Sequence, residues 1–180
     1  MLIVSLGNNC SIQLAISKLF KYFNSVFSWC KSYEINKVIE CLDNNFEGLL
    51  DFKNYKNNYN ILYQLNFQHN FIGNKEDKSF NEFKDTIKRK IDRFNNFDNK
   101  TVYFVRCDKK IDYFLVNKLF KSLQNKFPKI QIYLIIFGAK IINKKFELNK
   151  NIKINIIPNF FNLREIMHRP NIINALAKTN

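Results

Sequence analysis

The chain has 180 residues, of which 46% are hydrophobic and 16% aromatic, a composition that excludes intrinsic disorder and predicts a single domain over residues 1–180. Its formal net charge is +14, yet only five of its 29 basic residues are arginine, the residue best suited to bidentate phosphate and base contacts. Base-specific recognition of nucleic acid is therefore not expected, whereas weak electrostatic association remains open.

The cysteines and histidines exclude the common small scaffolds. Cys10, Cys30, Cys41 and Cys107 form no C-x-x-C pair, and the two histidines are far apart, so we expect no structural metal, no cofactor and no disulfide framework. The first apolar run is too short for a signal peptide, and no segment has the length of a membrane span. These features predict a cytoplasmic protein with no membrane partner.

In the first half of the chain, one buried strand precedes two helices. An apolar run predicts the strand, and apolar residues three and four apart predict the helices. The elements expected here are a strand over 2–6, a helix over 11–22, an aromatic connection over 23–31, a helix over 33–43, an irregular segment over 44–58, and a strand or extended segment over 60–67.

The second half alternates helices and strands. Its clearest element is an amphipathic helix over 79–94, with Phe80, Phe83, Ile87, Ile91 and Phe94 on one face. The pattern then predicts strands over 101–105, 130–137 and 152–157, and helices over 111–127 and 160–177, the last broken near Pro170.

This alternation is typical of an α/β fold with a mostly parallel sheet and helices on both faces, a three-layer, Rossmann-like arrangement. The carboxyl ends of parallel strands lie at one edge of a sheet, where ligands bind in such folds. The segments expected to meet at this edge are Gly7 to Cys10, Arg106 to Asp108, Gly138 and Asn159.

Cys10 is the first candidate for chemistry, because it lies on the turn between the first strand and the helix that follows. The positive end of a helix dipole lowers the pKa of a thiol and favours the reactive thiolate. Asn8 or Asn9, together with the Cys10 backbone N–H, would then form an oxyanion hole. The alternatives are that Cys10 is a small hydrophobic residue at a helix start and that the asparagines supply turn geometry and capping.

A thiolate nucleophile needs a base, and the chain contains two histidines. His69 lies in a polar break after an extended segment, whereas His168 follows Glu165 at a spacing that lets the two pair on a helix. Each histidine taken alone also fits a structural or surface role.

Several short motifs follow one another along the first 106 residues: Ser5-Leu6-Gly7-Asn8-Asn9-Cys10, Phe27-Ser28-Trp29, His69-Asn70-Phe71, the basic helix segment over 88–94, and Phe104-Val105-Arg106. In content and order they resemble the motifs of an uncharacterised family of papain-like cysteine peptidases from bacteria and large DNA viruses. The resemblance covers residues 2 to 106 and implies a cysteine-dependent hydrolase with Cys10 as nucleophile and His69 as base. It implies the host cytoplasm as location if the chain is viral.

The third catalytic group stays open, because Ser28 and Asn70 stand where the family usually carries aspartates. Asp108 at the sheet edge is another candidate for orienting the histidine. The papain fold has an antiparallel, barrel-like sheet, whereas the strand and helix alternation here favours a parallel one.

Two further functions compete with this interpretation. The chain also resembles esterases of the GDSL type, in which case Cys10 replaces serine and Glu165 and His168 complete the site. Alternatively, Arg106 binds an anion at the sheet edge of a non-catalytic module, unless it forms an ion pair with Asp108 or Asp112. The substrate is expected to be a peptide or a small molecule, and its identity is not specified by these motifs.

Overall fold

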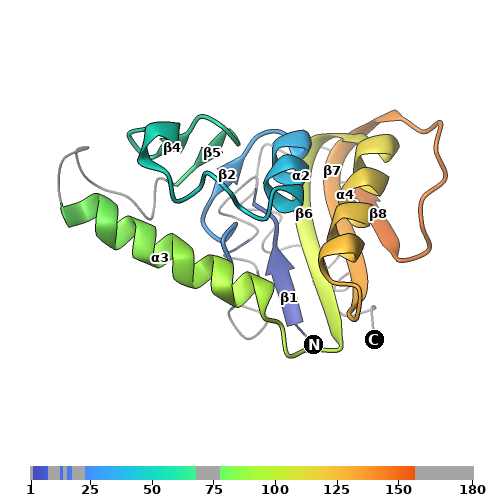
Figure 1. Cartoon of the computed structure of the whole chain (residues 1–180). Coiled ribbons are helices and arrows are strands. Elements are labelled where there is room, and N and C mark those ends of the chain that lie inside the picture. The colour runs from blue at the N-terminus through green and yellow to red at the C-terminus, as the bar shows by residue number, and fades with distance from the viewer. Residues whose placement is uncertain (1, 8–12, 14–15, 18–22, 68–77, 157–180) are drawn as a thin grey trace.

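The computed structural model describes residues 2–7, 13, 16–17, 23–67 and 78–156, and its centre is a parallel sheet. The strands lie in the order β1-β6-β7-β8, and every neighbouring pair is parallel (Figure 1). Their bounds are Leu2–Ser5 for β1, Thr101–Asp112 for β6, Gln131–Asn143 for β7 and Ile152–Ile156 for β8. The predicted mixed α/β class with a parallel sheet is therefore confirmed for this part of the chain.

Two of these strands are much longer than predicted. β1 ends opposite Val105, whereas β6 and β7 continue as a pair as far as Asp112 and Asn143. The predicted ends at Val105 and Phe137 were wrong, because the two strands satisfy each other's backbone beyond the last residue of β1. Arg106, Asp108 and Gly138 consequently lie inside strands rather than in the loops after them.

Two helices lie together on one face of this sheet, and a third lies near its β1 edge. Helices α2 (Ile35–Asp43) and α4 (Tyr113–Lys126) lie side by side, and α3 (Lys78–Asn95) runs on the β1 side of the molecule (Figure 1). The predicted helices over 33–43 and 79–94 are confirmed within two residues. The helix predicted from Ile111 instead begins at Tyr113, where the Asp112 carboxylate accepts a hydrogen bond from the Phe114 N–H.

A phenylalanine cluster fills the space between the sheet and these helices. The Phe94 ring of α3 lies 5.7 Å from the Phe27 ring, 5.4 Å from Phe46 and 5.5 Å from Phe127, measured between centroids. Aromatic pairs at such distances and tilts stabilise the fold beyond the area that they bury. The cluster fixes α3 and the segment around Phe27 relative to the sheet.

A second, antiparallel sheet lies next to α3 and was not predicted. Its order is β2-β5-β4-β3, with two residues in each strand: Lys31–Ser32, Leu65–Asn66, Tyr59–Asn60 and Tyr55–Lys56. A short 3-10 helix, Phe52–Asn54, immediately precedes β3. The segments predicted as irregular or extended over 44–67 thus form a small folded unit, and β2 brings Ser32 close to the end of β1.

The opposite face of the parallel sheet carries a smaller apolar cluster. Ile16, which is helical, packs there with residues of β1, β6 and β7: Ile3, Tyr103, Val105, Cys107, Ile135 and Phe137. The helix predicted over 160–177 lies outside the described residues. In the part of the chain that the structure describes, no helix combines the length and apolarity needed to cross a bilayer.

Lys90 of α3 is an unexpected buried cation. Its ammonium donates to the Ser28 carbonyl oxygen at 3.5 Å, and burial lowers its pKa to about 8. A lysine whose pKa is lower in the folded protein than in the unfolded chain opposes folding while it carries its charge.

We therefore expect the free energy of unfolding to rise between pH 8 and pH 10.5, because the unfolded chain binds the Lys90 proton more tightly over this range. Lys90→Met should remove this rise and make the protein more stable at neutral pH, by at most about 3 kcal/mol. Urea unfolding of both proteins across this pH range measures the difference. Identical pH dependence in the two proteins would contradict the expectation.

Candidate functional site

The turn after β1 depends on a glycine. Gly7 has φ +80°, a backbone conformation that is unfavourable for residues with a Cβ atom. Its N–H donates to the Ser5 hydroxyl oxygen at 3.2 Å. A Cβ atom at this position would lie 2.6 Å from the Ser32 hydroxyl oxygen and 3.3 Å from the Cys30 carbonyl oxygen. The main chain of residues 30–32 therefore packs directly against the turn, and only glycine fits between them.

Arg106 is the centre of the site. It follows the β6 residue paired with the end of β1, and its side chain is 0% exposed. Its Nη1 donates to the Leu6 carbonyl oxygen at 3.1 Å and to the Ser32 hydroxyl oxygen at 2.8 Å. Its Nη2 donates to the Ser32 carbonyl oxygen at 3.1 Å. One guanidinium thus connects β6, the turn after β1 and β2.

The remaining two donors of Arg106 bind Asp108. Nε donates to Oδ2 at 2.7 Å and Nη2 donates to Oδ1 at 2.8 Å, in a bidentate pair. Burial raises the pKa of the Asp108 carboxyl, and the Arg106 charge opposes that rise. Of the two roles left open for Arg106, anion binding or an ion pair with Asp108 or Asp112, the structure shows the ion pair with Asp108. All five N–H groups of Arg106 have protein acceptors, so an anion would have to displace one of these bonds.

Serine hydroxyls complete this buried network on the other side of the turn. Ser25 donates from its hydroxyl to the Ser5 carbonyl oxygen at 3.3 Å. Ser28 accepts from the Ser25 N–H at 2.9 Å and donates to the Phe23 carbonyl oxygen at 3.3 Å. The segment Phe27-Ser28-Trp29 is therefore positioned behind the turn, with Phe27 and Ser28 both buried. Sequence reasoning named Ser28 only within the Phe27-Ser28-Trp29 motif and missed Ser25, because no local pattern links Ser25 to Ser5, 20 positions away.

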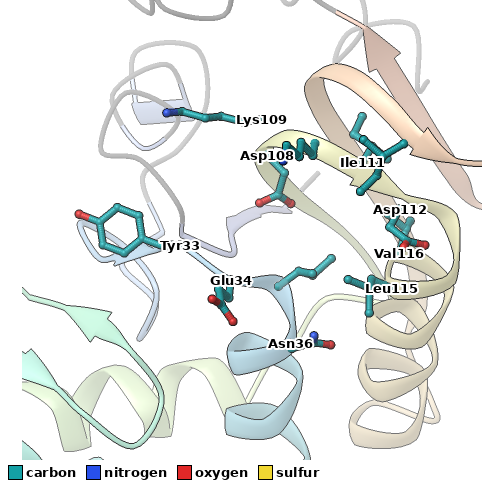
Figure 2. A pocket seen from close by; sticks show the side chains of 12 residues that line it. Tyr33, Glu34, Asn36, Asp108, Lys109, Ile111, Asp112, Leu115 and Val116 are labelled. Atoms are coloured by element: carbon teal, nitrogen blue, oxygen red, sulfur yellow. The ribbon is translucent and has the colours of Figure 1, made fainter.

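A cavity of about 450 Å³ adjoins this network at the end of the sheet. It lies between the first residues of α2, the end of β6 and the start of α4 (Figure 2). Asp108 and Glu34 face it from two sides, and Leu115 and Val116 form part of its apolar wall. Its position matches the ligand sites of α/β folds, which lie beyond the carboxyl ends of parallel strands.

The structure brings together two of the predicted site residues, Arg106 and Asp108. Cys10, Asn8, Asn9 and His69 lie outside the described residues, as do Glu165 and His168. Three residues beyond Cys10, Gln13 is helical and buried, and neither atom of its side-chain amide has a hydrogen-bond partner. Such a group destabilises a fold unless water or a ligand completes it, and its place near Cys10 in the sequence makes Gln13 a functional candidate that sequence reasoning missed.

The other cysteines are poor nucleophiles. Cys30, Cys41 and Cys107 are buried thiols, and burial raises the pKa of the Cys41 and Cys107 thiols. Within the described residues, no three His, Cys, Asp or Glu side chains are grouped so that they could hold a metal ion. No protein-family model, curated protein or solved structure matches this chain.

Proposed function

We propose that the protein is a cysteine-dependent hydrolase or acyl-transfer enzyme with Cys10 as its nucleophile. The observation that carries the proposal is the buried hydrogen-bond network around Arg106, which holds Leu6 and Gly7, four and three residues before this thiol. A turn on the protein surface does not need a buried arginine with five protein acceptors to hold its conformation. Arg106 pre-organises the segment from which a nucleophile would be presented.

His69 is the proposed base, with Asn8 or Asn9 and the Cys10 N–H as the oxyanion donors. In this scheme the thiolate attacks a carbonyl carbon, the oxyanion donors stabilise the tetrahedral intermediate, and the histidinium protonates the leaving group. Water then hydrolyses the acyl-enzyme, or a second nucleophile takes the acyl group. Gln13 supports the proposal, because its unpartnered amide lies one helical turn beyond Cys10 in the sequence.

We further propose the finer fold and its family. A three-layer arrangement with helices on both faces is supported by helical Ile16, which packs on the sheet face opposite the core that contains Val38 and Leu119. The motif order over residues 2 to 106 supports membership of the uncharacterised papain-like peptidase family. The cysteine pattern, which lacks a disulfide framework, supports a cytoplasmic location. The binding-module alternative relied on Arg106, whose donors are all used within the protein.

Alkylation by iodoacetamide, followed site by site with mass spectrometry, tests the proposed nucleophile. We expect Cys10 to react fastest, with a pH profile that gives a thiol pKa below the ordinary value of about 8.5. His69→Ala should move this pKa back towards the ordinary value, because the stabilising imidazolium is lost. Burial protects Cys30, Cys41 and Cys107, which serve as internal controls.

Acyl transfer by the wild type and by variants at Cys10 and His69 can be measured with p-nitrophenyl acetate as substrate, because it releases p-nitrophenolate. A burst that Cys10→Ser abolishes would support the proposal. An ordinary thiol pKa that His69→Ala leaves unchanged would overturn it, whatever the rate of alkylation.

A further inference from the structure

The positive charge of the chain is concentrated in one part of the fold. From Tyr113 to Ile156, which comprises α4, β7 and β8, Glu147 is the single acidic residue, whereas nine lysines occur there. Eight of them are exposed and Lys126 is half-buried. The nine are Lys118, Lys121, Lys126, Lys129, Lys140, Lys144, Lys145, Lys150 and Lys153. This segregation creates a local positive potential much stronger than the average charge would produce.

Three of these lysines line a groove between α2 and α4. The groove has a volume of about 520 Å³ and contains Lys118, Lys121 and Lys126 from α4, facing residues 42–45 at the end of α2. Asp43 is the one carboxylate among its lining residues. The ammonium of Lys126 is already positioned, because it donates to the Asn45 side-chain oxygen at 2.6 Å and lies 4.7 Å from the centre of the Phe46 ring.

An aromatic pair lies at the other end of the same helix face. Phe114, Lys118, Lys121 and Asn125 are spaced four, three and four residues apart, so they form one exposed stripe of α4. The Phe114 ring lies 5.3 Å from the ring of Phe146, and both side chains are exposed.

The loop that carries Phe146 is fixed to α4. Asn117 donates from its side chain to the Glu147 carbonyl oxygen at 2.8 Å, and its side-chain oxygen accepts from the Asn149 N–H at 3.4 Å. Helix α4 thus lies between the groove on its α2 side and this loop, which also carries Lys144 and Lys145 (Figure 1). The aromatic pair and the lysines therefore form one continuous surface.

We propose that this surface, formed by the α2–α4 groove, the exposed stripe of α4 and the loop before β8, binds single-stranded nucleic acid. The lysines contact phosphates, and the Phe114–Phe146 pair stacks on an unpaired base. A groove between two helices admits a flexible chain, whereas a flat bilayer surface cannot enter it. The proposed interaction does not require arginine. Lysine can contact phosphates, and the bidentate base contacts for which arginine is best suited are needed only to read a base sequence.

Fluorescence anisotropy with a labelled oligothymidine of about 16 nucleotides tests this proposal. We expect binding that weakens steeply between about 50 and 200 mM salt. Lys118→Gln combined with Lys121→Gln should weaken binding about tenfold at the lower salt and reduce the slope of log K against log salt by about 1.4. Phe114→Leu should weaken binding without changing that slope, because stacking involves no counterion.

The matched control is Lys84→Gln combined with Lys88→Gln, which removes the same charge from exposed positions of α3. This control should bind like the wild type. Equal losses in both double variants would overturn the proposal, since binding would then follow net charge alone. Binding to phosphatidylserine vesicles or to polyglutamate, without binding to the oligonucleotide, would assign the surface to another partner and overturn it as well.

Discussion

Replacing Arg106 by methionine is expected to destabilise the fold by about 3–5 kcal/mol, the cost of leaving one partner of a buried ion pair without the other. The Asp108 carboxylate would stay buried without the Arg106 cation, and the carbonyl oxygens of Leu6 and Ser32 would each lose the hydrogen bond from the guanidinium. Urea denaturation measures the loss. Arg93→Met, at an exposed position of α3, is the matched control and should change stability by less than about 0.5 kcal/mol.

A double variant separates the ion pair from the anchoring of the turn. Arg106→Met combined with Asp108→Leu should recover much of the lost stability, because no unpaired charge remains buried. The deficit that persists then measures the bonds from Arg106 to Leu6 and Ser32. If the double variant folds and alkylation of Cys10 still slows, Arg106 acts as a positioning residue for the thiol. A single variant within about 1 kcal/mol of the wild type would contradict the assigned role.

The role of Arg106 shows where sequence reasoning stops. Its partner Asp108 lies two positions away and was foreseen, but Leu6 and Ser32 are 100 and 74 residues distant. Nothing in the local pattern of residues 106–108 shows that the segment around Ser32 covers the guanidinium and excludes solvent from it. A polar residue after an apolar strand therefore resembled an exposed ligand-binding arginine, although it is a buried connector.

The full lengths of β6 and β7 could not be predicted from the sequence for a related reason. Residues 106–112 contain five charged side chains and resemble a turn, yet they continue β6 because β7 pairs with them. Cross-strand pairing decides such cases, and single-strand propensity does not. The parallel order itself was predictable, because apolar strands over 101–105 and 130–137 flank a helix of sufficient length.

The small antiparallel sheet could not be predicted from the sequence for a different reason, the shortness of its strands. Its strands have two residues each, which is too short for an alternating pattern to emerge. Its turns use positive φ at Asn57, an ordinary turn residue, and at Gln64, which gives no turn signal. Even so, this sheet places Ser32 against the candidate site, so part of the site was out of reach of pattern analysis.

Gly7→Ala is expected to destabilise the protein by roughly 3 kcal/mol, from backbone strain at φ +80° and from overpacking against Ser32. The added methyl group would meet the Ser32 hydroxyl oxygen at 2.6 Å, and that hydroxyl cannot move freely because Arg106 donates to it. The turn would shift instead, and with it the chain that leads to Cys10. We therefore expect urea unfolding at lower concentration together with slower alkylation of the Cys10 thiol.

Gly48→Ala provides the matched control, because Gly48 has φ +83° and the same strain applies. There the added Cβ would meet the Leu62 side-chain tip at 2.7 Å, which can rotate away, and the Asn54 amide nitrogen at 2.9 Å, which donates to the Gly48 carbonyl oxygen at 3.0 Å. Its cost should therefore be the strain of about 1–2 kcal/mol together with about 1 kcal/mol for the Asn54 hydrogen bond, with Cys10 reactivity unchanged. Equal slowing of Cys10 alkylation by the two substitutions would show that Ser32 does not constrain the turn. A larger effect at Gly7, accompanied by slower alkylation, would link the buried network to the geometry of the thiol.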